Sequence, residues 1–166
     1  MKSVYLGLGS NIGDREANLR EALERLEAAG IRAARRSSLY ETEPLELRDQ
    51  PWFLNAVVEV ETDLFPLQLL GCIQNIEREM GRQRVTPKGP RNIDIDILFY
   101  GRSVIDTAEL HIPHPSIAQR RFVLEPLSEI APELRHPLNG KAAREMLAAA
   151  KADADPQAIR RLNITL

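Results

Sequence analysis

The alternation of apolar and polar residues is clearest between residues 93 and 100. Four apolar residues share one face of an extended strand there, and two acids share the other. The apolar face holds Ile93, Ile95, Ile97 and Phe99, and the polar face holds Asp94 and Asp96. The two carboxylates repel each other, since strand residues two apart are separated by about 6.6 Å and project the same way. A hard cation would relieve that repulsion, and a solvated face on an edge strand would also tolerate it.

The same patterns divide the first hundred residues into further elements. They predict strands over residues 3–8, 36–42 and 53–61, a helix from an Asp14 cap to Gly30, and a helix over residues 66–80. The order strand, helix, strand, strand, helix, strand is the split βαβ order of a ferredoxin-like α+β sandwich, in which helices pack on one face of an antiparallel sheet and leave the other for a ligand. The tail predicts one more helix, over residues 142–151. With no repeat or linker, residues 1–166 read as a single domain.

The first predicted strand runs into a glycine-rich segment with Gly7, Gly9 and Gly13. Their spacing is one residue out of register for the dinucleotide-binding fingerprint. We interpret them as a tight strand-to-helix turn, whose backbone N–H groups could face a ligand.

Composition narrows the classes of partner. The 166 residues carry 22 Lys and Arg against 24 Asp and Glu, a net charge of −2, so no global charge favours a nucleic acid or an acidic membrane. The single cysteine, Cys72, excludes an internal disulfide and fits a reducing cytosol. No apolar run approaches the roughly 20 residues of a membrane span. We expect a cytoplasmic protein.

A cationic loop, residues 82–91, runs directly into the strand with the two acids. It carries four cations, Arg82, Arg84, Lys88 and Arg91. Short charge runs are usually solvated surface loops. Cations beside paired acids are also what a metal–polyphosphate ligand requires, because the acids bind the metal and the arginines bind phosphate. The juxtaposition favours this second interpretation.

The sequence lacks the residues that several other kinds of metal-binding or catalytic site require. His111 and His114 have no further ligand spaced to complete a zinc set. There is no phosphate-binding loop of the GxxxxGK[ST] type, no protein-kinase motif set and no nucleophile elbow. Cys72 lies in a predicted helix without basic neighbours to activate it.

The motifs together resemble the 6-hydroxymethyl-7,8-dihydropterin pyrophosphokinase family. Residues 89–98 closely resemble its signature, as do residues 7–14, and the resemblance continues in order to about Glu133. The further matching segments are Ser38–Thr42, Asp49–Pro51, Phe53–Ala56, Gln74, Glu77, Gly81–Arg82, Arg84, Pro113–His114, Arg120–Phe122 and Ile130–Glu133.

The resemblance implies an Mg²⁺-dependent transfer of pyrophosphate from ATP to the hydroxymethyl group of a reduced pterin, giving AMP, in folate biosynthesis. It implies that Asp94 and Asp96 bind two Mg²⁺ ions that hold the triphosphate, with Asp94 also close to the pterin hydroxyl. Arg82 and Arg91 would stabilise charge on the transferred group or on AMP. The implied nucleotide-contacting residues are Gln74, Glu77, Arg82, Arg84, Arg91, Ile97, His114 and Arg120. The implied pterin-binding residues are Thr42, Pro44, Leu45 and Asn55, with Phe53 and Phe122 stacking on the ring faces.

Four positions depart from the family's pattern, at Val85, Lys88, Glu109 and Pro115. They leave the implied metal and pterin sites unchanged and concern loop closure and ATP binding. Two other classes remain as alternatives: a non-catalytic sensor that binds nucleotide or pterin through the same residues, and an RNA-binding ferredoxin-like module. The RNA-binding module would need exposed aromatic residues on the central strands, where this chain has acids. We expect a monomer whose partners are its small-molecule substrates.

Overall fold

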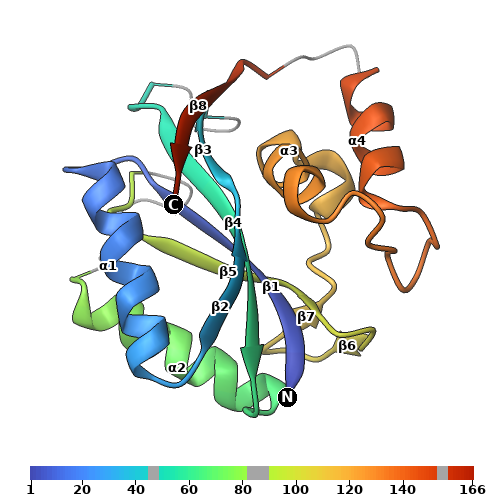
Figure 1. The fold of residues 1–166 in the computed structure, drawn as a ribbon, viewed down its shortest axis with the longest axis horizontal. Helices are drawn as coiled ribbons and strands as arrows, with labels where there is room; N and C mark the ends of the chain where they lie inside the picture. The colour runs from blue at the N-terminus through green and yellow to red at the C-terminus, as the bar shows by residue number, and fades with distance from the viewer. Residues whose placement is uncertain (45–48, 82–89, 153–156) are drawn as a thin grey trace.

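The computed structural model describes residues 1–44, 49–81, 90–152 and 157–166, which form a twisted antiparallel sheet between two layers of helices (Figure 1). The sheet order is β5 (Asp94–Tyr100), β1 (Lys2–Ser10), β4 (Phe53–Thr62), β3 (Ser38–Thr42) and β8 (Ile159–Thr165). Strand β2 (Arg32–Arg36) pairs with the far end of β4. The predicted ferredoxin-like α+β fold is confirmed, with β8 added at one edge.

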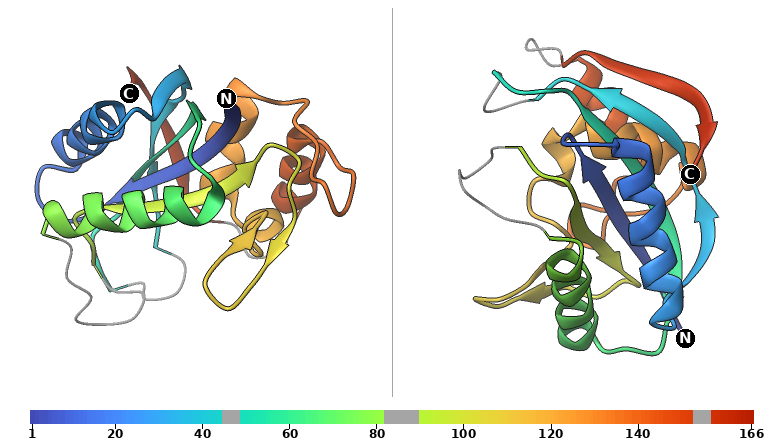
Figure 2. Two further views of the ribbon diagram at one scale, coloured as in Figure 1. Left: turned by 90° about the horizontal axis from the view of Figure 1, so that it is seen from below. Right: turned by 90° about the vertical axis from the view of Figure 1, so that its left-hand side faces the viewer.

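Helices α1 (Arg15–Ala28) and α2 (Pro66–Glu79) cover one face of the sheet (Figure 2). As predicted, Asp14 caps α1, and its carboxylate accepts a hydrogen bond of 3.0 Å from the backbone N–H of Ala17. The inward residues of β1, β4 and β5 alternate with outward ones, so they meet both helices in one apolar core. That core includes Leu6, Leu8, Leu54, Val58, Ile95 and Ile97 from the strands and Leu19, Leu26, Leu69 and Ile73 from the helices.

The second face is not left wholly open, contrary to our expectation. Helices α3 (Arg121–Ile130) and α4 (Ala143–Lys151) cover part of it, together with the single 3₁₀ turn η1 (Ile117–Gln119). A two-stranded ribbon, β6 (Ile105–Asp106) and β7 (His111–Ile112), lies between β5 and η1 along the chain. The uncovered part of this face, beside the start of α3, holds the site described below.

Three local predictions need correction. The strand predicted over residues 36–42 begins only at Ser38, as β3, and Arg36 instead ends the preceding strand β2. The two strands are separated at the buried Ser37, whose hydroxyl accepts a hydrogen bond of 2.9 Å from the Val57 backbone N–H. Phe99 lies on the opposite face from the isoleucines of β5, because the pairing with β1 shifts by one residue at Leu98. The sequence pattern did not identify β8 as a strand.

None of the helices in the described ranges has the length and apolar character needed to cross a membrane.

The carboxylate of Glu129 fastens α3 to the sheet. It accepts hydrogen bonds from the backbone N–H of Ser38 at 3.0 Å and from the Tyr40 hydroxyl at 2.8 Å, and it forms an ion pair with Arg161 of β8 at 3.1 Å. Burial, followed by this contact with Glu129, raises the pKa of Tyr40. Because α3 begins at the site, Glu129 fixes the position of one of its walls.

We expect Glu129→Ala to lower the free energy of unfolding by about 2–3 kcal/mol, because it leaves the Ser38 N–H and the Tyr40 hydroxyl without their acceptor. Urea denaturation measures the change. Glu133→Ala is the matched control, because the ion pair of Glu133 with Arg144 is exposed, and it should cost less than about 0.5 kcal/mol. Equal losses in the two variants would contradict this role for Glu129.

Candidate active site

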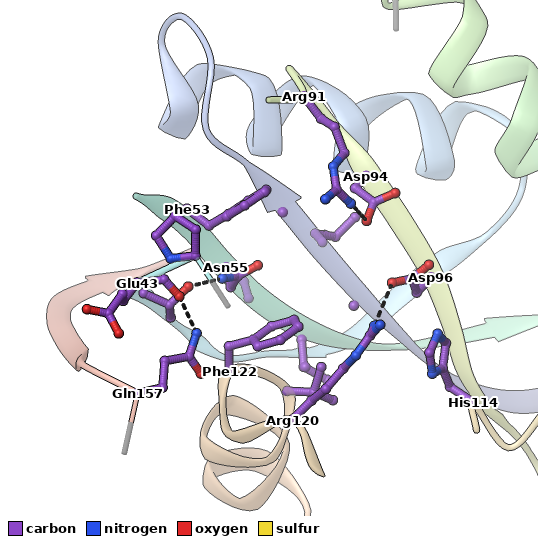
Figure 3. Close-up of a pocket in the computed structure, with 18 of the residues that line it drawn as sticks. Glu43, Phe53, Asn55, Arg91, Asp94, Asp96, His114, Arg120, Phe122 and Gln157 are labelled. Carbon is purple, nitrogen blue, oxygen red and sulfur yellow. Dashed lines mark hydrogen bonds and ion pairs between the residues drawn. The ribbon is translucent and has the colours of Figure 1, made fainter. Parts of the chain in front are cut away.

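A cavity of about 340 Å³ opens on the second face of the sheet, between the strands and the start of α3 (Figure 3). Strands β1, β3, β4 and β5, helix α3 and the segments beside them all contribute to its walls. Its lining includes Gly7, Gly9, Thr42, Glu43, Pro44, Gln50, Phe53, Asn55, Arg91, Asp94, Asp96, His114, Arg120, Phe122 and Gln157.

Two glycines of the central strand β1 form the floor of the cavity. Gly9 pairs with Asp94 of β5 on one side and with Asn55 of β4 on the other. Gly7 pairs with Asp96 of β5. A Cβ added at Gly9 would lie 2.7 Å from Asn55 Oδ1, closer than van der Waals contact allows. The predicted turn is therefore wrong for these two residues, since both lie within the strand, where the missing side chains leave room above the sheet.

The two acids lie at one end of the cavity, and each has an arginine beside it. Arg91 Nη1 is 3.0 Å from Asp94 Oδ2, and Arg120 Nη1 is 4.0 Å from Asp96 Oδ2. Burial, and then the neighbouring charge of Asp94, raises the pKa of Asp96 to about 7, against the opposing effect of the arginines. A further positive charge near the two acids would relieve this cost.

The donor set fits a magnesium ion that a ligand's phosphates help to hold. Among the described residues no group of three or more His, Cys, Asp and Glu side chains could hold a metal ion by itself. Mg²⁺ keeps several waters and binds to proteins through one or two carboxylates together with substrate phosphates. Asp94 and Asp96 supply such a pair, with side chains that are 17% and 36% exposed.

Glu77 of α2 fixes the strand that carries this pair. Its carboxylate accepts a hydrogen bond of 3.0 Å from the backbone N–H of Ile95, between the two acids. Because β5 is an edge strand, a side chain is needed to satisfy this N–H. Glu77 is buried and does not line the cavity, so here it positions the strand.

The other end of the cavity is aromatic and amide-lined. Phe53 comes from β4 and Phe122 from α3, and each ring has a guanidinium over it: Arg91 at 5.2 Å from the Phe53 centroid and Arg120 at 5.5 Å from the Phe122 centroid. Asn55 donates a hydrogen bond of 2.6 Å to Thr42 Oγ1. A flat ring with polar edges suits such walls.

The buried side chain of Asn11 links the segment that precedes Phe53, at the aromatic end of the cavity, to the segment that precedes Asp94, at the acidic end. Its side-chain amide donates to Gln50 Oε1 at 2.9 Å and to the Pro51 carbonyl at 3.0 Å, and its Oδ1 accepts from the backbone N–H of Arg91 at 2.7 Å. The segment before Phe53 and the segment before Asp94 therefore share one anchor.

Most of the site residues predicted from the sequence meet at this cavity. The ten that line it are Thr42, Pro44, Phe53, Asn55, Arg91, Asp94, Asp96, His114, Arg120 and Phe122. Gln74 is exposed on α2 and Ile97 packs in the core, so neither lines the cavity. Leu45, Arg82 and Arg84, with the departures Val85 and Lys88, lie outside the described residues.

Sequence reasoning missed Gln50, Glu43 and Gln157 as lining residues. Gln50 stood within the matched segment Asp49–Pro51, so the motif itself offered the signal. Gln157 follows the last predicted helix and belongs to no motif or periodic pattern. Only the pairing of β8 with β3 brings it to the cavity.

A ferredoxin-like sheet with paired acids, arginines and an aromatic cavity is the arrangement expected of a class of protein that binds a phosphorylated ligand beside a planar ring. Residues 5–132 match the model of the 7,8-dihydro-6-hydroxymethylpterin-pyrophosphokinase (HPPK) family. The chain belongs to this family.

Its relatives include stand-alone proteins and longer ones. The chain is 46% identical over 163 residues to the 2-amino-4-hydroxy-6-hydroxymethyldihydropteridine pyrophosphokinase of Methylorubrum extorquens, covering 98% of this chain and 99% of the relative. It is 47% identical over 132 residues to the protein of that name from Bacillus subtilis, covering 79% of each. The folic acid synthesis protein fol1 of Pneumocystis carinii is 48% identical over 139 residues, which are 84% of this chain and 19% of that protein. The chain thus spans about a fifth of the length of this fungal relative.

Solved structures agree on the fold. The chain superposes on a triple mutant of Plasmodium falciparum HPPK-DHPS with a TM-score of 0.75 and 20% sequence identity. The match covers 89% of this chain and 44% of that one. At this identity the likeness bears on the fold alone.

We expect Gly9→Ala to lower the free energy of unfolding by about 1–3 kcal/mol, because the new methyl group must displace Asn55 from its bond with Thr42. Denaturation and the side-chain amide resonances of Asn55 measure the two effects. Gly71→Ala is the matched control: nothing lies within 4 Å of its added Cβ, and alanine in a helix should raise stability by about 0.5–1 kcal/mol. An unshifted Asn55 resonance in Gly9→Ala would contradict the steric argument.

Proposed function

We propose that the protein transfers pyrophosphate from ATP to 6-hydroxymethyl-7,8-dihydropterin and releases AMP, as a step in folate biosynthesis. One observation carries this proposal: a single cavity joins a carboxylate pair with arginines to an aromatic, amide-lined end across the bare floor at Gly9. The family match and the names of the stand-alone bacterial relatives support it. A cytoplasmic location and a monomeric state remain predictions.

In this proposal the two ends of the cavity divide the work. Phe53 and Phe122 stack on the two faces of the pterin ring, and Asn55 forms hydrogen bonds with its edge. Asp94 and Asp96 bind two Mg²⁺ ions, which would neutralise the triphosphate and acidify the pterin hydroxyl when bound. Asp94 and Asn55 both pair with Gly9, whereas Asp96 pairs with Gly7, two residues further along β1. Asp94 is therefore the acid nearer the pterin.

The reaction joins the hydroxyl oxygen of the pterin to the β-phosphorus of ATP, while the bond from that phosphorus to the α–β bridging oxygen breaks. The proton of the hydroxyl is lost and AMP leaves. Such a transfer depends on alignment and on compensation of charge rather than on a protein nucleophile. Arg91 and Arg120 already lie beside the acids, and we propose that they stabilise charge on the transferred group. Arg82 keeps its predicted roles in stabilising this charge and in contacting the nucleotide, and Arg84 keeps its predicted contact with the nucleotide.

The purified protein with ATP, Mg²⁺ and the pterin should form AMP and the pterin diphosphate in equal amounts, and EDTA should stop the reaction. Asp96→Ala should lower kcat by about 10³-fold or more through loss of metal, while part of the pterin binding survives. Asp106→Ala is the control, because Asp106 is exposed on β6 and contacts only His111 among the described residues. Binding of both ligands without AMP formation by the wild type would favour the sensor alternative instead.

We expect Arg91→Ala to separate rate from affinity. Loss of charge stabilisation should lower kcat by about 10²–10³-fold, whereas loss of its contact with the Phe53 ring should raise the Kd for pterin only about two- to fivefold. Single-turnover rates and calorimetric titration measure the two quantities. The exposed Arg102 offers a matched control, Arg102→Ala. Equal losses in rate and affinity would mean that Arg91 acts only by holding Phe53.

A further inference from the structure

Gln157 lines the aromatic end of the cavity from the C-terminal segment of the chain (Figure 3). It stands just before β8, beyond residues 5–132 that match the family. Gln157 is 7% exposed, so its polar side chain is buried in the wall of the cavity. A buried amide needs partners for both its donor and its acceptor.

The contacts of Gln157 fix which end of its amide faces which partner. Its Nε2 donates a hydrogen bond to the backbone carbonyl of Glu43. A carbonyl can only accept, so the nitrogen and not the oxygen must lie there. The backbone is held as well, since Arg121 Nη1 donates to the Gln157 carbonyl at 3.0 Å and the Glu43 N–H donates to the Ala158 carbonyl at 2.9 Å.

Gln157 Oε1 is left without a hydrogen-bond partner among the described residues, although the atom is buried. An unsatisfied buried acceptor destabilises the folded protein, and Gln157 lines the cavity. A ligand that donates a hydrogen bond at this end would remove that destabilisation.

Asn55 of β4 repeats the arrangement on the other side of β3. Its side-chain nitrogen donates to Thr42 Oγ1, and its Oδ1 lies over Gly9 on the cavity floor. Two amides therefore have their donors engaged by consecutive residues, Thr42 and Glu43. Both present carbonyl oxygens, which can only accept, at the end of the cavity that suits a flat ring.

We propose that Gln157 Oε1 accepts a hydrogen bond from the exocyclic amino group of the pterin and determines specificity for it. This inference rests on the proposed function. The amino-pyrimidinone edge of a pterin offers an N–H donor at its amino group, whereas an analogue with an oxo group at that position would bring two acceptors together. Gln157 thus selects an amino ring over an oxo ring.

The test is calorimetric titration of the protein with Mg²⁺ and α,β-methylene ATP present, using 6-hydroxymethylpterin and its 2-oxo analogue. Gln157→Met should weaken pterin binding about tenfold and change binding of the 2-oxo analogue less than about twofold. Gln157→Lys, which keeps a donor for the Glu43 carbonyl and removes the acceptor, should lose the same discrimination. Gln119→Met, at an exposed position of η1, should leave both affinities unchanged.

Unchanged affinity for α,β-methylene ATP shows that a variant is folded. If Gln157→Met loses this affinity, the proposal is tested with Gln157→Lys alone. Equal weakening of both ligands in the Gln157 variants would overturn the proposal, because it would show that Gln157 acts only by holding Glu43. Wild-type affinity for the pterin in both variants would also overturn it, with AMP formation by the wild type still upholding the proposed function. If the wild type binds no pterin, both proposals fall.

Discussion

The pairing of β1 with β5 on one side and β4 on the other is the constraint on which the site depends. Neighbouring strands lie about 4.8 Å apart, so Asp94 and Asn55, which both pair with Gly9, stand about 10 Å apart across the bare floor. A shift of one residue in either pairing would turn one of these side chains into the core on the far face. The apolar core under α1 and α2 therefore also fixes which polar groups face the cavity.

Segments outside the sheet are tied to this floor by buried side-chain amides. Asn11 holds the segments that lead into Phe53 and Asp94, and Gln157 holds Glu43, beside Pro44, which lines the cavity. Each bond joins chain segments far apart in sequence, so closing these loops costs entropy that only the folded sheet repays. The walls of the cavity are consequently a product of the whole fold and not of any single motif.

Sequence patterns predicted the site where pairing is regular and failed where long-range contacts decide. The alternation in β5 placed Asp94 and Asp96 together correctly, yet it put Phe99 on the wrong face, because a bulge at Leu98 has no signature in the pattern. Gly9 was read as part of a turn, since its real requirement, closeness to Asn55, comes from another strand. The position of Gln157 could not be predicted for the same reason, because only the pairing of β8 with β3 brings it to the cavity.

The charges of the cavity are arranged so that its two ends respond together. Arg91 contacts both Asp94 and the Phe53 ring, and Arg120 lies near both Asp96 and the Phe122 ring. Under the proposed function, a triphosphate would draw both guanidiniums towards its oxygens, since paired phosphates offer arginine stronger hydrogen bonds than a ring face does. The same movement would free the acids for Mg²⁺. Nucleotide binding would therefore prepare the acid pair for the metal through the two arginines.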